Sequence, residues 1–295
     1  PLIAPRQAEP RYLLLDEALA RNLARVTEVS ESGAVPELLF VNDADDKVLL
    51  IDGEELVGAR QNRILNVTLL VGGRQKVVIP VSCVEQGRWS ARGAESSTRF
   101  ETSVDYAPSK DMKIAARHSK SQAEVWNRVA ESHEKLSLAT NSNTASNVSH
   151  SSLPLTLENS RVRADSGEYV KALSSIVRNH SDVIGFVFAI NGEINSADTY
   201  GSSALFLKLW PKLLRASAIE AVAESGYAQQ RDAGSLPQPA LADIEKFFEI
   251  SETAAISNER TVTDRIEMIT RESERSVFLE SRDRDTLLHR SYIMK

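Results

Sequence analysis

The sequence contains a single cysteine, Cys83, so no disulfide can form within the chain. A lone thiol is typical of proteins that fold in a reducing compartment. No apolar run approaches the roughly 20 residues that a membrane-spanning helix requires. Residues 1–9 also lack the basic and apolar segments of a secretory signal peptide. We therefore expect a soluble, cytoplasmic protein that has no membrane partner.

The chain also lacks an excess of basic residues. Its 35 lysines and arginines are outnumbered by 41 aspartates and glutamates, which gives a net charge of −6. Proteins that bind the phosphate backbone of nucleic acids normally carry a basic stripe. Nucleic acid is therefore not an expected partner.

Signatures of common metal and cofactor sites are missing as well. The five histidines have no spacing that would place two on one helix turn, and there is no cysteine pair, so the sequence predicts no metal site. It contains no Walker loop, no glycine-rich dinucleotide fingerprint and no nucleophile elbow. No cofactor is identified, and the usual nucleotide, nicotinamide and hydrolase interpretations lose their support.

What the chain does have is a composition typical of a folded protein, with 42% hydrophobic residues in 295. Its first third is rich in short aliphatic runs separated by turn-forming clusters, which indicates antiparallel strands. The predicted strands are 38–41, 48–51, 64–71 and 77–84. We expect an α+β fold in one domain, with an N-terminal, mostly antiparallel β layer or sandwich packed with several helices.

Helices are predicted from residue 16 to 23, 121 to 136 and 166 to 177. The second helix begins with a capping box, Ser121 with Glu124. Residues 140–159 are polar and aperiodic, so we expect a mobile internal loop there. Asn191-Gly192 predicts a hairpin.

In the last third, Pro211 predicts that a helix ends or kinks near Trp210 and that another starts at Pro211, because proline has no amide for an interior helical hydrogen bond. A further helix is expected over residues 239–248. Residues 265–294 alternate apolar and polar side chains in short stretches, which predicts a C-terminal β meander.

Two polar segments that follow apolar strands, 52–66 and 82–89, are the candidate functional site. Glu55 and Glu85 could divide general acid and base roles if burial raised one pKa. Carboxamides and guanidiniums bind polar or anionic groups, and an indole offers a stacking face. The candidate ligand-binding residues are Glu54, Arg60, Gln61, Asn62, Gln86, Arg88 and Trp89.

Residues of these two segments also have structural explanations. Gly53 and Gly58 fit turns or bulges, and Glu54 and Arg60 could merely cap the edge of a sheet, as charged residues often do. Cys83 follows an apolar run and has no histidine nearby in sequence, which favours a packed thiol over a nucleophile. The segments therefore mark a place to look for function and identify no reaction.

The same residues resemble a known family. Residues 50–63 and 79–89, followed by 122–126, 191–192 and 210–215, are similar to the ARPP domain family, named for its association with ADP-ribosylglycohydrolase and rhodanese or phosphatase-superfamily proteins. The resemblance covers about residues 10–225 and fades beyond them. It implies a link to ADP-ribose or other nucleotide-derived metabolites, and it carries no established activity.

The residues and the resemblance together are compatible with two functions. In the first, the chain binds or processes a small polar metabolite, ADP-ribose or nucleotide related, in a pocket formed by segments 52–66 and 82–89. In the second, it is a non-catalytic module that docks a partner protein, and the two segments are structural. The sequence does not decide whether the chain is an enzyme.

Overall fold

The computed structural model describes residues 1–5, 12–30, 33–91, 96–103, 109–119, 121–146, 149, 151–178, 180–228, 238–261, 263 and 265–295. Contacts between residues divide the chain into two compact units. We call Arg11–Gly167 the central unit, and Pro1–Pro10 with Glu168–Lys295 the terminal unit. The α+β class is confirmed, and the expectation that the chain behaves as a single domain stays a prediction.

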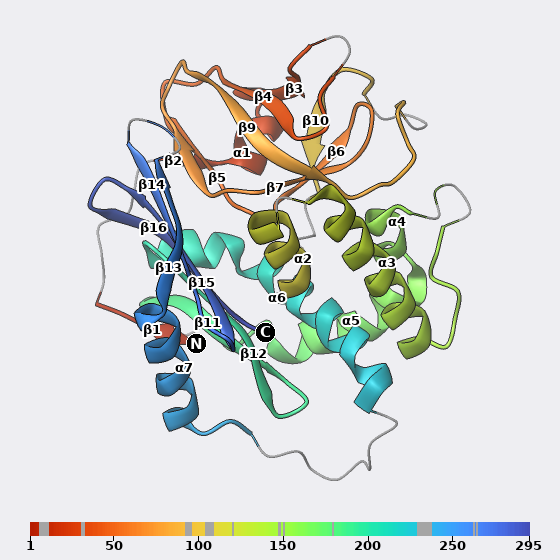
Figure 1. Ribbon diagram of the computed structural model, residues 1–295, viewed down its shortest axis with the longest axis vertical. Helices are drawn as coiled ribbons and strands as arrows, with labels where there is room; N and C mark the ends of the chain where they lie inside the picture. The colour runs from red at the N-terminus through yellow and green to blue at the C-terminus, as the bar shows by residue number, and fades with distance from the viewer. Residues whose placement is uncertain are drawn as a thin grey trace. The chain divides into compact units, whose positions relative to one another are not determined.

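The central unit is built around a closed barrel of short strands, drawn in red to yellow in Figure 1. Neighbouring strands pair antiparallel, in the order β10-β3-β4-β9-β7-β6. The strands are β3 (Ala24–Glu28), β4 (Glu37–Asn42), β6 (Glu55–Gly58), β7 (Arg63–Leu65), β9 (Lys76–Cys83) and β10 (Phe100–Thr102). The expected antiparallel layer is thus a barrel.

Apolar side chains of alternate residues fill the barrel interior, because successive side chains on a strand point to opposite faces. Val26 pairs with Phe40, and Leu38 pairs with Ile79. These four side chains and Leu56 are all fully buried. They form the core of the barrel.

A three-stranded sheet completes the β structure of the central unit, formed by β2 (Tyr12–Leu14), β5 (Lys47–Leu50) and β8 (Leu69–Val71). Strands β2 and β5 run parallel, and β5 and β8 antiparallel. The prediction of one strand over residues 64–71 was wrong. The chain leaves the barrel after β7 and enters this sheet at β8, so two strands of different sheets share one apolar run.

The helices of the central unit follow the strands. They are α1 (Leu15–Ala20), α2 (Lys110–Ile114), the π-helix η1 (Ala115–Ser119), α3 (Gln122–Ala139), α4 (Leu153–Leu157) and α5 (Ser160–Leu173), the last of which continues into the terminal unit. The predicted cap of α3 is confirmed, since the Ser121 side chain accepts from the Glu124 amide. Within the expected mobile loop, the structure has α4, which buries Leu153 and Leu157. Mobility of the segment stays a prediction.

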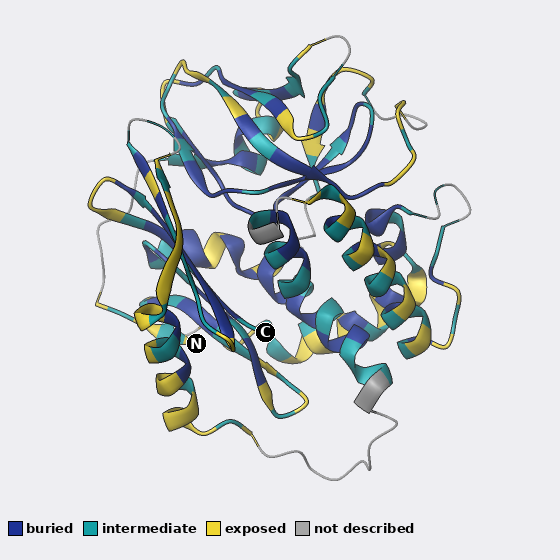
Figure 2. Ribbon diagram, viewed as in Figure 1, coloured by how far each residue is buried: buried dark blue, intermediate teal, exposed yellow. Residues whose placement is uncertain are grey.

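The terminal unit contains a seven-stranded antiparallel sheet with the order β1-β11-β12-β16-β15-β14-β13. Its strands are β1 (Leu2–Ile3), β11 (Val183–Ile190), β12 (Glu193–Tyr200), β13 (Ala255–Thr261), β14 (Ile266–Glu272), β15 (Ser276–Asp283) and β16 (Thr286–Met294). The Asn191-Gly192 hairpin is confirmed, and both residues have the positive φ that its turn requires. The C-terminal meander is also confirmed, and Figure 2 shows that its edge strand β13 is largely exposed.

Two long helices pack on this sheet, α6 (Ser203–Ala228) and α7 (Leu241–Thr253). The predicted helix end near Trp210 was wrong, since α6 continues through Pro211, and the alternative of a kink there stays a prediction. Buried side chains before and after the proline, Phe206 and Leu214, are part of one apolar side of the helix. Packing of that side on β11 outweighs the missing amide donor.

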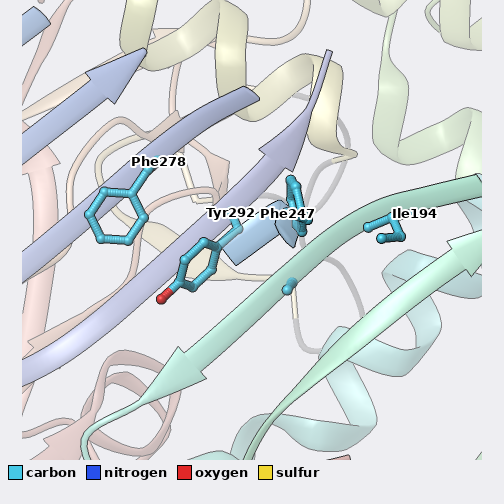
Figure 3. Packing of buried hydrophobic residues seen from close by; sticks show 5 residues of the cluster. Ile194, Phe247, Phe278 and Tyr292 are labelled. Atoms are coloured by element: carbon cyan, nitrogen blue, oxygen red, sulfur yellow. The ribbon is translucent and has the colours of Figure 1, made fainter. Parts of the chain in front are cut away.

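An aromatic cluster joins α7 to the sheet (Figure 3). Phe247 of α7 packs with Ile194 of β12, Phe278 of β15 and Tyr292 of β16. The ring centroids of Phe278 and Tyr292 are 4.9 Å apart. No helix among the described residues is long and apolar enough to cross a membrane.

Candidate functional site

The two polar segments singled out in the sequence lie side by side in the barrel wall. Strand register pairs Arg63 with Cys83, and the Val84 amide donates to the Asn62 carbonyl at 3.1 Å. The Gln61 side-chain amide donates to the backbone carbonyls of Glu85 at 3.3 Å and Arg88 at 2.7 Å. The two segments are therefore in contact, and the pocket expected between them stays a prediction.

Glu85, Arg88 and Asn62 form a buried network where the segments meet. Arg88 Nε lies 2.6 Å from Glu85 Oε2, and Arg88 Nη2 donates to Asn62 Oδ1 at 2.9 Å. Glu85 Oε2 also accepts from the Asn62 backbone amide, and Glu85 is fully buried. The Glu85 carboxylate thus connects Asn62 of the first segment with Arg88 of the second. Its action as a catalytic acid or base stays a prediction.

Glu55 lies on the other face of the wall from Arg63. It pairs with Ile64, which pairs with Ser82, whereas Arg63 pairs with Leu56 and Cys83. Because paired residues in a sheet point to the same face, the side chain of Glu55 is directed away from the barrel interior. It is fully buried there. The predicted division of roles between Glu55 and Glu85 stays a prediction.

Asp52 and Glu54 shape the turn before β6. Glu54 Oε2 accepts from the Ile51 amide at 3.0 Å, and Asp52 accepts from the Thr68 hydroxyl. Arg117 Nη2 lies 2.7 Å from Asp52 Oδ1, and both side chains are nearly inaccessible to solvent. These contacts favour a structural role for the turn, and a ligand contact by Glu54 stays a prediction.

Arg63 belongs to this cluster although it was not among the candidates from the sequence. Its side chain is fully buried, and Nη1 donates to the Gln61 carbonyl at 3.1 Å. Among the described residues, Nε and Nη2 have no hydrogen-bond partner. Burial lowers the pKa of the guanidinium, so its surroundings disfavour the charged form. Strand alternation did not single out Arg63, because Ile64 and Leu65 after it are both apolar and both buried.

Trp89 covers this guanidinium. The Cζ atoms of Arg63 and Arg60 lie 5.8 Å and 5.3 Å from the centre of its ring. The Trp89 side chain remains 42% exposed, so part of the ring is in solvent. On strand β3 of the same barrel, Glu28 carries a carboxylate whose two oxygens are buried. We call Glu28, Arg60, Arg63 and Trp89 the barrel-end site.

The remaining candidates lie around this site. The Gln86 side chain is exposed, and the backbone carbonyl of Gln86 accepts from the Ser151 hydroxyl at 2.6 Å. Gln61 Oε1 and Asn62 Nδ2 are buried and have no hydrogen-bond partner among the described residues. These two atoms are available to a bound molecule that reaches them.

Cys83 lies in the wall between the two segments. Gln122 of α3 accepts from the Cys83 amide and donates to its carbonyl, at 2.8 and 2.7 Å. Burial raises the pKa of the thiol, which keeps it protonated and poorly nucleophilic. No three histidine, cysteine, aspartate or glutamate side chains group in metal-binding proximity within the described part of the chain.

Comparison with known proteins identifies a family. The model of a protein family described as the "ARG and Rhodanese-Phosphatase-superfamily-associated Protein domain", ARPP-1, matches residues 1–293. The match continues well past residue 225, where the resemblance of individual sequence segments fades. No curated protein and no solved structure matches.

Proposed function

Because the chain belongs to the ARPP-1 family, whose description links it to other proteins only by association, we propose a function from the barrel-end site itself. The chain binds a small polar metabolite that carries a phosphate or carboxylate group. A nucleotide-related molecule such as ADP-ribose is the first candidate. Arg63 binds the anionic group, and Trp89 stacks on a flat part of the ligand.

The observation that carries this proposal is the unused edge of the Arg63 guanidinium. Nε and Nη2 lie on the same side of the planar group and donate in parallel, which is the geometry that binds carboxylate or phosphate oxygens in pairs. Both nitrogens are buried and have no hydrogen-bond partner among the described residues. A buried, unpaired charge is unfavourable, so an anion that pairs with it gains binding energy.

Trp89 adds a second determinant. Its ring lies against Arg60 and Arg63 and remains partly exposed. An adenine base or a sugar ring can stack on such a surface, and stacking of a base on an aromatic side chain contributes about 1–3 kcal/mol. Because Arg63 is fully buried, an incoming anion has to pass Trp89, whose side chain can rotate.

The test compares ADP-ribose, AMP and inorganic pyrophosphate by isothermal titration calorimetry. Trp89→Ala should weaken binding of ADP-ribose and AMP about tenfold, through the lost stacking contact. It should leave pyrophosphate binding unchanged or tighter, because the path to Arg63 is opened. Trp89→Phe is the matched control and should retain most of the affinity. No heat of binding and no shift in Tm for any of the three at millimolar concentration would refute the proposal.

A second function, a non-catalytic module that docks a partner protein, is favoured by the contacts of the polar segments with one another. Gln61, Asn62, Glu85 and Arg88 bind each other and nearby backbone groups, as structural residues do. If this function is right, Gln61→Met should lower the free energy of unfolding, and the metabolites above should not bind wild-type protein. Metabolite binding that depends on Trp89 would contradict it.

A further inference from the structure

We propose that the ligand of the barrel-end site carries a hydrogen-bond donor group next to its anionic group, and that this donor, a hydroxyl or an ammonium, binds Glu28. This inference rests on the proposed function and narrows it to a class of ligand. The class comprises phosphorylated polyols and phosphorylated amines. Simple anions without a donor group are expected to bind more weakly.

The first observation is the state of the Glu28 carboxylate. Oε1 and Oε2 are both buried, and neither has a hydrogen-bond partner among the described residues. Almost all buried carboxylates in proteins are paired or hydrogen-bonded, because burial of an unpaired charge is strongly unfavourable. Among the described residues, Glu28 therefore lacks the partner that its burial would require, and so do Nε and Nη2 of Arg63.

Strand register places the two charges on the interior face of the same barrel. Glu28 pairs with Leu38, and Leu38 pairs with Ile79 on β9. Cys83 lies four residues after Ile79 on that strand, hence on the same face, and pairs with Arg63. Burial lowers the pKa of Arg63, and the nearby Glu28 carboxylate acts in the opposite direction on this pKa, as an opposite charge does.

The two side chains nevertheless form no ion pair with each other. No nitrogen of Arg63 lies within 4.0 Å of a Glu28 oxygen, within the part of the chain that the structure describes. Two opposite charges that are buried in the same region without contact can bind two different groups of one ligand. An anion placed against Arg63 leaves the Glu28 oxygens to accept from an adjacent hydroxyl or ammonium.

Gly33 marks the place where Glu28 and Trp89 come together. A Cβ atom built on this glycine would lie 3.2 Å from Glu28 Oε2 and 3.3 Å from Trp89 Cζ2. The same point is 3.2 Å from Arg60 Cδ, and Gly33 has a φ of +73°. The carboxylate, the indole and the Arg60 side chain thus border one small region, and Arg63 lies against the same indole, with its Cζ atom 5.8 Å from the centre of the ring. With Glu28 negative and two arginines positive, this region favours a ligand with net negative charge and one donor group.

The experiment uses three phosphate monoesters that differ in their donor groups. Methyl phosphate has no hydroxyl or ammonium, ribose 5-phosphate has hydroxyls, and phosphoethanolamine has an ammonium. We expect wild-type protein to bind at least one of the last two about tenfold more tightly than methyl phosphate, since a hydrogen bond to a charged group contributes roughly 1.5–3 kcal/mol. Preference for ribose 5-phosphate identifies the donor as hydroxyl, and preference for phosphoethanolamine as ammonium.

Glu28→Met should abolish this preference and leave methyl phosphate binding equal or tighter. The matched control is Glu37→Met, because Glu37 is exposed on the neighbouring strand β4 and pairs with Pro80 on the outer face. Glu28→Gln, which keeps an acceptor, should retain part of a preference for hydroxyls. Circular dichroism establishes that each variant is folded.

Two results overturn the inference. Equal affinity of wild-type protein for all three esters would do so, as would a preference that survives Glu28→Met. Neither of these two results contradicts the proposed function if methyl phosphate binds to wild-type protein. If none of the esters binds to folded wild-type protein, and ADP-ribose does not either, the proposed function itself has failed and the inference fails with it.

Discussion

Replacement of Arg63 by methionine should make the ligand-free protein more stable, which is the reverse of what removal of a buried residue usually does. Methionine matches the length of the arginine stem and introduces no polar atom. The guanidinium that it removes is fully buried and has two nitrogens without a hydrogen-bond partner among the described residues. The variant therefore removes an unfavourable charge and keeps most of the packing.

The expected size follows from three opposing contributions. Burial of an ion typically costs several kcal/mol. The hydrogen bond from Nη1 to the Gln61 carbonyl and the contact with Trp89 each return about 1–2 kcal/mol. We expect Arg63→Met to raise the free energy of unfolding by about 1–2 kcal/mol, which corresponds to a rise of roughly 2–6 °C in Tm for a protein of this size.

The assay is thermal unfolding of wild type, Arg63→Met and Arg63→Lys, each with and without ADP-ribose. Without ligand, Arg63→Met should have the highest Tm. With ligand at about 100 times its Kd, wild type gains about 2.7 kcal/mol by mass action, and Arg63→Met should gain nothing. Arg63→Lys keeps the charge without the paired donors. Its Tm should exceed that of ligand-free wild type by little, and ADP-ribose should raise its Tm by little. If the Tm of ligand-free Arg63→Met were about 3 °C or more below that of wild type, the guanidinium would be a stabilising residue and the expectation would be wrong.

Three further predictions concern the rest of the structure. Arg88→Met removes the ion pair between Arg88 and the buried Glu85 carboxylate and should lower the free energy of unfolding in urea by about 3–5 kcal/mol. A loss below about 1 kcal/mol would mean that this pair contributes no more than a solvent-exposed one. Burial lowers the pKa of His133 below 6.5, so the folded state binds fewer protons, and stability should be complete above pH 6.5 and fall as the pH decreases below it. Tm measured from about pH 5 to 7 should show this slope, and His133→Gln should reduce it. Phe247→Ala should lower the free energy of unfolding by about 3–5 kcal/mol, because its ring fills the cluster between α7 and the sheet; an unchanged urea midpoint would show that this cluster can collapse around the vacancy.

Elements with strong local signals could be predicted from the sequence. The cap of α3 at Ser121 and the Asn191-Gly192 hairpin depend on residues that are close in sequence, and both are present. Closure of the barrel depends on β10, a strand of three residues that pairs with both β3 and β6. Such pairing joins residues far apart in the chain and leaves no periodic pattern. The helix end predicted near Trp210 is absent for a related reason, since tertiary packing of α6 outweighed a local preference.

The candidate site was predictable in its location and less so in its members. Polar residues that follow apolar strands indicated that segments 52–66 and 82–89 would meet, and residues 61–63 and 84–88 of these segments are in contact. Arg63 and Glu28 were missed because charged residues are normally exposed. Which face of a strand they occupy depends on the register of the closed barrel, and the sequence does not specify that register.

The pairing of β1 with β11 affects how the chain folds during synthesis. Leu2 lies opposite Gly185, although the whole of the central unit is encoded between them. The ribosome therefore completes residues 11–167 before it makes the strand that β1 needs. We expect the central unit to fold first, as an insertion within the terminal unit, while the N-terminal strand waits without a neighbour. A nascent chain arrested after residue 167 should accordingly already resist proteolysis in its barrel.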